Sequence, residues 1–530
     1  MSAAFDGAWP YGFLQNLKQQ PPDWRSIVLV NLFVGLAVLL SISVISETVS
    51  PLRRYQGPFF AKWTNIWRLY LVRTGSYHVE VKKLHDKYGP VVRIGPNLLD
   101  LDLPELIKTL YNTDGKWRKT EFYHNNSAII NGKTTYHLFS ETDQVEHARI
   151  KRPIVKYYSQ SSVGAFEPLM DKVIGDFCKH LETRFMDGEQ KHFDLGQWIA
   201  FYSWDMNGAA SFSQRFGYMD NGSDFDKSID TADKALDYFA AVGQMPFLDF
   251  LLEKNPILRI GPPVMGNVAS KAHAYLTSRL QGKDYNFDPK VPDFLQHFID
   301  AKAAHPNVVD EGVIMGYLLV NLIAGADTTA ITIRAVFYYV LKNPDAYRKL
   351  EDEVLAAQLG EVASFGAARA LPYLEAVVRE AMRMHPAVCM LLERYVPESG
   401  LSLPDGSYVP PGTAVGINPY VVGRNQLIWG DDADVYRPER WLRGHTPGTK
   451  TETEESYRER LRLFNASDLT FGGGSRVCIG RSFALMEVYK IVATLVARYR
   501  IELTDPRREW DVTASWFPRQ KGLMCHMHPR

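Results

Sequence analysis

The chain has 530 residues, of which 46% are hydrophobic and 23% are charged. This composition is ordinary for a globular protein, and the length is sufficient for a large hydrophobic core. Lys and Arg together number 60, as do Asp and Glu, so no net positive charge attracts nucleic acid and we expect no nucleic-acid partner. The four cysteines form no C-x-x-C pair, which excludes a disulfide-rich scaffold and suits a reducing compartment.

The N-terminal region carries one long apolar stretch. Ile27 to Ile45 are nearly all apolar, and at ~1.5 Å per residue this stretch reaches roughly 28 Å, close to the thickness of a bilayer core. A cleaved signal peptide is the alternative, but its apolar region is usually only about 7–15 residues long. Basic residues follow the stretch and predict that the remainder is cytosolic: Arg53, Arg54, Lys62 and Arg68. We expect a lumenal segment at 1–26, a transmembrane anchor at 27–46, a hinge at 47–58 and one large domain at 59–530.

Downstream of the hinge, the hydrophobic pattern predicts mainly helices with a few short strands. The longest helix is expected from about Glu311 to Lys342, where nearly every side is apolar, as in a helix at the centre of a large fold. An amphipathic helix is expected from about Leu374 to Met384. Short strands are expected at Val91–Ile94, Ser407–Val409 and Ala414–Ile417. The expected fold class is therefore mainly α with small β sheets, in one domain.

One glycine-rich segment combines residue types that suit a metal cofactor. It runs from Phe471 to Gly480 with Cys478 near its end, and an apolar helical pattern follows. A thiolate at a helix start is stabilised by the helix dipole, and cysteine thiolate is a strong donor to haem iron. Gly472 and Gly480 allow the backbone to approach a flat macrocycle, Arg476 can pair with a carboxylate, and the Phe471 ring can cover the sulfur.

The alternative for a lone cysteine is a small buried core residue, and we expect that role for Cys178, Cys389 and Cys525. For Cys478 the pattern F-x-x-G-x-R-x-C-x-G argues otherwise, since it should arise by chance with a probability on the order of 10⁻⁴. The segment resembles the haem-binding signature of the cytochrome P450 family, and the similarity extends from about Gly57 to the C-terminus. The resemblance implies the P450 fold, mainly α with small β sheets and preceded here by one transmembrane helix. It also implies haem b (iron protoporphyrin IX), with Cys478 as the axial ligand of the iron.

An E-x-x-R motif lies on the predicted helix Leu374–Met384. Glu380 and Arg383 are three residues apart and share one helical face, where an exposed pair would contribute little to stability. The motif resembles the P450 motif in which these two residues are buried with a second arginine from a later loop. Here that loop is Tyr436-Arg-Pro-Glu-Arg-Trp441, so Arg440 is the expected third member. We expect the three residues to stabilise the haem-binding core without taking part in the reaction.

The segment Ala324-Gly-Ala-Asp-Thr-Thr329 interrupts the long apolar helix. Glycine costs about 1 kcal/mol relative to alanine inside a helix, and a carboxylate among apolar residues also needs an explanation. Threonines in a helix usually hydrogen-bond to carbonyls four residues earlier, and this is the simpler alternative. The segment resembles the oxygen-activation helix of the family, in which a glycine, here Gly325, loosens one turn beside the iron. The resemblance implies that the Thr328 hydroxyl contacts dioxygen and that Asp327 supplies protons.

Haem propionates need cations, and the resemblance implies four residues beside them: Arg476, Arg394, His147 and Lys151. The family usually has His or Trp followed four residues later by Arg, and Lys151 departs from that pattern. Lysine can pair as a point charge but lacks the planar fork of the guanidinium. Other basic residues of this segment could dock an acidic reductase or form a solvated helix face: Arg149, Arg152 and Lys156.

The resemblance implies a haem-thiolate monooxygenase that inserts one oxygen atom from O₂ into a hydrophobic small-molecule metabolite. The chain is similar to filamentous-fungal, microsomal members of the pisatin-demethylase-like and secondary-metabolite groups. We expect electrons from NADPH through a separate NADPH–cytochrome P450 reductase, with cytochrome b5 as a second donor, at the endoplasmic reticulum membrane. Substrate contacts are expected from residues 117–139, 321–328, 387–392 and 516–517. The alternatives are a P450-fold isomerase or dehydratase, a monooxygenase that detoxifies phytoalexins or other foreign compounds, and a haem sensor without catalysis.

Overall fold

The computed structural model describes residues 24–130, 133–186, 191–262, 266–444 and 452–530 of the protein. The chain divides into two compact units, Met1–Arg54 and Tyr55–Arg530. In the first unit, helix α1 (Trp24–Val49) contains the predicted anchor and extends it by three residues at each end. Aliphatic and aromatic side chains along α1 are exposed, Leu29 at 65% and Phe33 at 73%. The predicted lumenal segment lies outside the described residues as far as residue 23.

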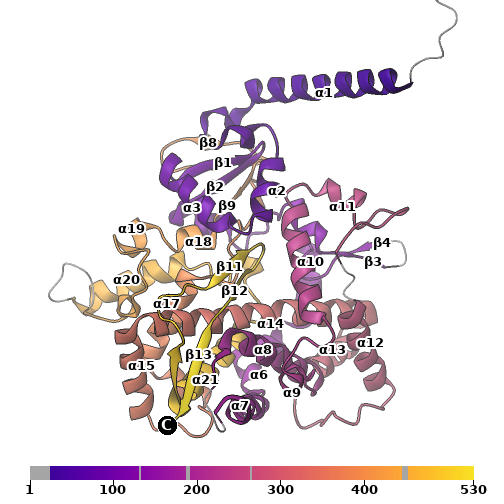
Figure 1. Cartoon of the computed structure of the whole chain (residues 1–530). Helices are drawn as coiled ribbons and strands as arrows, with labels where there is room; N and C mark the ends of the chain where they lie inside the picture. Colours follow the sequence, from indigo (N-terminus) through magenta and orange to yellow (C-terminus); the bar gives the residue numbers. More distant parts are fainter. Residues whose placement is uncertain (1–23, 131–132, 187–190, 263–265, 445–451) are drawn as a thin grey trace, which may run out of the picture. The chain divides into compact units, whose positions relative to one another are not determined.

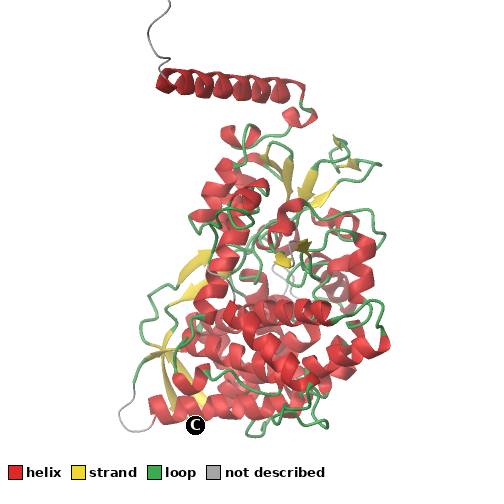
Figure 2. Ribbon diagram, turned by 90° about the vertical axis from the view of Figure 1, so that its right-hand side faces the viewer, coloured by secondary structure: helices red, strands yellow, loops and turns green. Residues whose placement is uncertain are grey.

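The second unit is mainly helical, and its strands are short (Figure 2). Its longer helices are α3 (Tyr77–Tyr88), α7 (Glu167–Leu181), α8 (Leu195–Phe212), α10 (Ser228–Val242), α12 (Gly266–Leu280), α13 (Phe294–Ala304), α14 (Glu311–Lys342), α15 (Pro344–Ala356), α17 (Pro372–Met384), α20 (Glu454–Ser467) and α21 (Arg481–Arg498). Its shorter helices are α2 (Ile66–Arg73), α4 (Ile107–Leu110), α5 (Gln144–Lys151), α6 (Gln160–Gly164), α9 (Tyr218–Asn221), α11 (Phe247–Leu251), α16 (Phe365–Arg369), α18 (Pro419–Val422) and α19 (Gln426–Trp429). Helix α14 has the predicted bounds, and α17 begins two residues before its predicted start.

Helix α14 is the central helix of this unit. Its N-terminus is capped by Asp310, whose side chain accepts a hydrogen bond from the Val313 N–H at 2.8 Å, and its C-terminus lies before Asn343-Pro344, where proline cannot continue the ladder. It packs against α8, α17 and α21, and Figure 1 shows it running through the middle of the helical region. Helix α14 is long and apolar enough to cross a membrane, but half of its most apolar 18-residue stretch is buried inside the fold. It is therefore the core helix that the sequence predicts.

The described strands form five small sheets. The largest has the order β1–β2–β9–β6, with bounds Val91–Gly95, Leu98–Leu101, Ala414–Gly416 and Arg394–Tyr395. A second has the order β10–β13–β5, with bounds Tyr499–Leu503, Met524–Pro529 and Phe193–Asp194. The two-stranded sheets are β11 (Asp511–Ala514) with β12 (Pro518–Lys521), β3 (Ala128–Ile130) with β4 (Lys133–Thr135), and β7 (Leu401–Ser402) with β8 (Tyr408–Val409). The predicted strands correspond to β1, β8 and β9, each within one residue of its expected ends, so the fold class is confirmed as mainly α with small β sheets.

Candidate functional site

The glycine-rich loop holds Cys478 through backbone contacts. The Cys478 N–H donates to the Phe471 carbonyl at 2.8 Å and closes the loop just before α21. Gly472 and Gly474 have φ angles of +69° and +60°, a left-handed conformation that glycine adopts without strain. These two glycines therefore shape the loop itself. A Cβ at Gly480 would lie 4.0 Å from the Cys478 Sγ, an ordinary contact distance, so Gly480 leaves space beside the sulfur.

Cys478 is exposed, whereas the other three cysteines are buried, as predicted. Although part of the side chain is open, enough protein surrounds the sulfur that desolvation raises the pKa of the Cys478 thiol. The Gly480 backbone N–H and the positive charges of Lys151 and Arg481 act in the opposite direction but do not outweigh desolvation. The backbone N–H groups at the helix start therefore lower the pKa of this thiol, as predicted, but desolvation outweighs them and the pKa is raised overall. A bound metal ion would supply the missing stabilisation of the thiolate.

A cluster of basic side chains lies beside the loop: Lys119, His147, Lys151, Arg394 and Arg476. We refer to it as the cation cluster, although the lowered pKa of His147 leaves that member uncharged. The members repel one another. Burial, followed by the charge of Arg476, lowers the pKa of His147 to about 3. Burial and the charge of Arg394 lower the pKa of Arg476 to about 10. No ion pair within the described part of the chain involves a member of the cluster. The four residues that the family resemblance implied are thus brought together, with Lys119 in addition.

The hydrogen bonds of the cation cluster go to backbone carbonyls. Lys119 Nζ donates to the Phe139 carbonyl at 2.6 Å, and Lys151 Nζ donates to the Ser475 carbonyl at 3.0 Å. The Nε of Arg476 is buried and has no hydrogen-bond partner among the described residues. A buried N–H without a partner is costly, and cations without carboxylates favour an anion. The cluster is therefore suited to bind a ligand that carries carboxylates.

Sequence reasoning missed Lys119, because no motif surrounds it. The residue is 5% exposed, and its Nζ lies 3.7 Å from the centre of the Tyr123 ring and 4.3 Å from that of Phe139. Burial lowers the pKa of Lys119 well below its ordinary value, and neighbouring guanidinium groups lower it further. One feature of the sequence could have indicated its burial. Lys119 lies in the stretch Trp117-Arg-Lys-Thr-Glu-Phe-Tyr123, and three aromatic residues in so short a stretch are unusual for a solvated loop.

The Ala324–Thr329 segment is continuous helix within α14. The Thr328 hydroxyl donates to the Ala324 carbonyl at 2.6 Å, which is the contact expected under the simpler alternative. No break in the helix accompanies Gly325, and the structure gives a different reason for this glycine. A Cβ at Gly325 would lie 2.6 Å from the Asn207 Nδ2 of α8. A larger residue at this position would displace the Asn207 amide, so glycine allows this side chain to lie against α14.

Asn207 and Tyr158 connect the middle of α14 with its neighbours. Asn207 Nδ2 donates to the carbonyls of Asn321 at 2.9 Å and Leu322 at 3.3 Å. Tyr158 donates through its hydroxyl to the Asn321 Oδ1 at 2.6 Å. Burial raises the pKa of Tyr158, and the nearby Cys478 thiol also raises it. Tyr158 thus contacts Asn321 of α14 and interacts electrostatically with Cys478. The cysteine loop and the Asn321 turn of α14 therefore lie close to one another.

Asp327 is buried at 7% exposure beside α8. Its Oδ1 accepts a hydrogen bond from the Trp204 Nε1 at 2.9 Å, and its Oδ2 is buried without a partner among the described residues. Burial raises the pKa of Asp327, while the Trp204 hydrogen bond and the charges of Arg334 and Arg519 oppose that rise. The overall effect is a pKa above the ordinary value for this carboxyl group, so Asp327 holds its proton more tightly than an exposed aspartate does.

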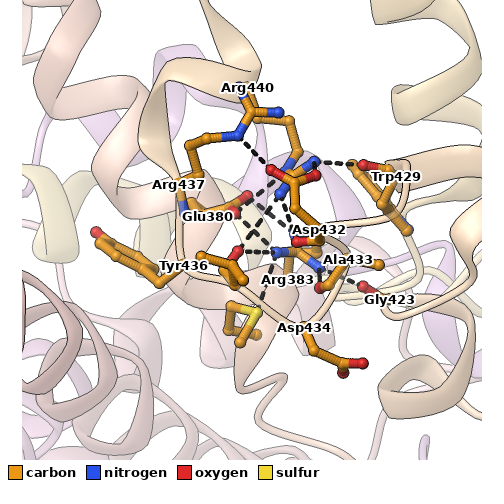
Figure 3. A network of polar contacts seen from close by, with 12 residues as sticks. Glu380, Arg383, Gly423, Trp429, Asp432, Ala433, Asp434, Tyr436, Arg437 and Arg440 are labelled. Carbon is orange, nitrogen blue, oxygen red and sulfur yellow. Dashed lines mark hydrogen bonds and ion pairs between the residues drawn. The ribbon is translucent and has the colours of Figure 1, made fainter. Parts of the chain in front are cut away.

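Glu380, Arg383 and Arg440 meet in a buried ion-pair network (Figure 3). Glu380 is fully buried and lies 2.7 Å from Arg383 Nη2 and 3.2 Å from Arg440 Nε. The Trp441 Nε1 donates to its other oxygen at 2.9 Å, and Arg440 also pairs with Asp432 at 2.8 Å. Burial alone would raise the pKa of Glu380, but Arg383 and then Arg440 lower it overall. The network connects α17 with the later loop, so it is a structural element of the core.

The segments predicted to contact substrate meet in one apolar cluster. The members from those segments are Phe122, Tyr123, Phe139, Ile323, Ala387, Val388, Met390, Leu392, Trp516 and Phe517. Helix α10 adds Leu236 and Phe239, which sequence reasoning missed. The Phe239 ring centre lies 4.8 Å from that of Phe122 and 5.3 Å from that of Trp516. The aromatic rings of this cluster therefore come from three distant parts of the chain, and Lys119 of the cation cluster contacts one of them, Tyr123.

Comparison with known proteins gives related sequences over nearly the whole chain. The sequence model of the cytochrome P450 family matches residues 57–526. Cytochrome P450 monooxygenase cfoH of Aspergillus candidus is 47% identical over 499 residues, which cover 94% of this chain and 92% of that protein. Cytochrome P450 monooxygenase cicH of Emericella nidulans is 36% identical, with 92% of this chain and 96% of that protein covered. Cytochrome P450 monooxygenase mpaDE of Penicillium brevicompactum is 33% identical over 89% of this chain, but the chain spans only 55% of that protein.

Proposed function

The chain belongs to the cytochrome P450 family and is a monooxygenase of that family, and we propose that Cys478 is the axial ligand of its haem iron. The observation that carries this proposal is an exposed thiol beside a cluster of cations that have no acidic partners in the described chain. The residues therefore fit haem, which needs one donor for iron and cations for its two propionates. Haem with a thiolate ligand can activate dioxygen, because electron donation from the thiolate favours cleavage of the O–O bond.

We propose that the cation cluster holds the propionates. The guanidinium groups of Arg394 and Arg476 offer paired N–H donors, and the buried Nε of Arg476 is a donor that still lacks an acceptor. Lys119 and Lys151 act as point charges. With a pKa of about 3, His147 is neutral at physiological pH and contributes an N–H donor rather than a charge.

We propose that Thr328 and Asp327 would hold and move protons for the dioxygen chemistry that a bound haem would supply. The Thr328 hydroxyl now donates to the Ala324 carbonyl, so its oxygen can accept a hydrogen bond while its own proton is held, and a side-chain rotation redirects that proton. Burial raises the pKa of Asp327, which is next in sequence to Thr328. A carboxylic acid placed there can replace a proton that the threonine releases.

We propose that residues 27–46 anchor the protein in the endoplasmic reticulum membrane, with residues 59–530 as the cytosolic haem-thiolate monooxygenase domain. The exposed apolar side chains of α1 and the basic residues after it support this proposal. NADPH–cytochrome P450 reductase is the proposed electron donor, with cytochrome b5 as a second donor. Arg149 forms an ion pair with Glu146 at 2.5 Å, so Arg152 and Lys156 are the better candidates for docking.

We propose a hydrophobic metabolite of fungal secondary metabolism as the substrate. The support is the apolar cluster beside α14 and the fungal origin of the related monooxygenases. The presence of both Asp327 and Thr328 favours oxygen insertion over an isomerase, a dehydratase or a sensor, since those activities do not need protons delivered to dioxygen.

The test is the spectrum of the reduced carbon monoxide complex of the full-length protein. We expect the red-shifted Soret band of a thiolate-ligated haem in the wild-type protein, its loss in Cys478→Ser, and its retention in Cys389→Ser. Cys389 is a matched control because it is fully buried, away from the loop. A red-shifted Soret band that persists in Cys478→Ser would refute the ligand assignment.

A further inference from the structure

His85 of α3 and Asp100 of β2 form a buried pair, and α3 packs against β1 of the same sheet (Figure 1). The His85 Nε2 lies 3.3 Å from the Asp100 Oδ1, and the exposed fraction of the side chain is 3% for His85 and 0% for Asp100. The other ring nitrogen, Nδ1, lies 3.1 Å from the Gly89 carbonyl oxygen. A carbonyl oxygen can only accept a hydrogen bond, so Nδ1 carries a proton.

The pair therefore needs a second proton at the contact between Nε2 and Oδ1. In a neutral ring protonated at Nδ1, Nε2 presents a lone pair to the Asp100 carboxylate, and the two repel each other. Apart from this contact, neither Asp100 oxygen has a hydrogen-bond partner among the described residues. An imidazolium at His85 turns the same contact into a buried ion pair. Burial lowers the pKa of His85, but the contact with Asp100 and the charges of Asp100 and Asp102 raise it overall.

The charged and titratable groups around this pair come from several elements. They are Tyr77 and Lys82 on α3, Arg68 on α2, Asp102 after β2, Tyr111 after α4, Glu393 before β6, and Arg93 of β1, whose guanidinium donates to the Gly95 and Pro96 carbonyls. Only Asp100 and Asp102 among them raise the pKa of His85, and Asp102 is held by a hydrogen bond from Asn425 Nδ2 at 2.9 Å. The positive charge on His85 therefore depends chiefly on Asp100.

The sheet that carries Asp100 also carries two members of the cation cluster. Asp100 of β2 lies opposite Gly416 of β9 in a parallel pair, and the neighbouring Val415 lies opposite Arg394 of β6. Lys119 forms an isolated antiparallel bridge with Arg394, so its backbone extends the same sheet. Backbone pairing therefore connects the strand under His85 with Arg394 and Lys119.

We propose that the protonated His85–Asp100 pair is a pH-sensitive fastening of α3 to this sheet, and that it keeps Arg394 and Lys119 in place for the haem propionates. The second part rests on the proposed propionate site. The folded-state pKa of His85 lies above its unfolded value of about 6.5. The stabilising contribution is thus fully present below pH ~6.5 and is lost as the pH rises through the folded-state pKa. The competing explanation is that the pair only packs α3 against the sheet and has no effect on haem.

Thermal unfolding of the full-length, haem-loaded protein between about pH 6 and about pH 9 tests the fastening. His85→Gln should lower the unfolding midpoint at the acid end, and its difference from the wild type should shrink as the pH rises. The matched control is His78→Gln, the same change at a buried position of the same helix. Burial lowers the pKa of His78 to about 3, so this residue is neutral over the whole range and its variant should differ from the wild type by a constant amount. A constant difference for His85→Gln, or equal pH dependence in the two variants, would overturn the proposal.

Haem transfer to apomyoglobin over the same pH range tests the connection with the cation cluster. At about pH 6, His85→Gln should release haem about threefold faster or more than the wild type, and the ratio should fall toward one as the pH rises. A ratio that does not change with pH, as expected for His78→Gln, would overturn the connection. If His85→Gln does not fold, Asp100→Asn replaces it with the same expected results.

Failure of this inference and failure of the proposed propionate site give different results. If the cation cluster does not hold the propionates, Lys119→Met leaves haem transfer at the wild-type rate, whereas the unfolding difference of His85→Gln still shrinks with pH. If the His85–Asp100 fastening is wrong, the unfolding difference stays constant while Lys119→Met still accelerates haem transfer.

Discussion

Replacing Glu380 by Gln removes one negative charge from the buried network and keeps the side-chain shape. Glu380 accepts from Arg383 at 2.7 and 2.9 Å, from Arg440 at 3.2 Å and from Trp441 at 2.9 Å. After the substitution Arg440 still pairs with Asp432, but Arg383 keeps only uncharged acceptors such as the backbone carbonyls of Gly423 and Ala433. Removing one partner of a buried ion pair typically costs about 3–5 kcal/mol. We expect a loss of unfolding free energy in this range.

Urea unfolding followed by tryptophan fluorescence measures this loss. The control is Glu146→Gln, the same chemical change in an exposed pair with Arg149, for which at most about 1 kcal/mol is expected. Equal losses in the two variants, or a loss below about 1 kcal/mol for Glu380→Gln, would refute the reasoning.

The pH dependence of the same variant follows from the lowered pKa of Glu380. Burial opposes ionisation, but Arg383 and Arg440 lower the folded-state pKa below its value in the unfolded chain, which is about 4.3. The stabilising contribution is therefore fully present above pH ~4.3 and is lost as the pH falls through the folded-state pKa. The difference in stability between wild type and Glu380→Gln should shrink correspondingly in acid.

Three further outcomes are expected. Thr328→Ala should retain haem but divert electrons from product to hydrogen peroxide, and an unchanged ratio of peroxide to NADPH consumed would contradict the role of this hydroxyl. Lys119→Met should accelerate haem transfer to apomyoglobin about tenfold or more, since a charge-assisted hydrogen bond contributes about 1.5–3 kcal/mol; a wild-type rate would remove Lys119 from the propionate site. Deletion of residues 1–54 should release the protein from microsomes into the supernatant after carbonate extraction, and persistent sedimentation with the membrane would contradict a single N-terminal anchor.

The elements that the sequence predicts well are those fixed by local pattern. Helix α14 has the expected bounds because its apolar pattern, its Asp310 cap and the Asn343-Pro344 stop are all local signals. The meeting of Glu380 with Arg440, 60 residues apart, follows from the family motif rather than from periodicity. Such long-range pairs are set by the packing of α17 against the loop and leave no local signature.

Other features depend on contacts that no single segment encodes. Gly325 makes room for the Asn207 side chain of α8, and the sequence contains no sign of which helix lies opposite. Lys119 joins the cation cluster, and Asp233 meets Arg519, only through the tertiary fold. The overall rise in the pKa of Cys478 could not be predicted for a related reason, because the extent of desolvation depends on neighbours from the rest of the chain.

The central claim is that Cys478 binds the haem iron, and iron K-edge X-ray absorption of the full-length resting protein tests it most directly. We expect one sulfur atom in the first coordination shell of the iron in the wild-type protein and in Cys389→Ala. The sulfur should be absent in Cys478→Ala. A shell without sulfur in the wild type, or a sulfur contribution that survives in Cys478→Ala, would contradict the assignment.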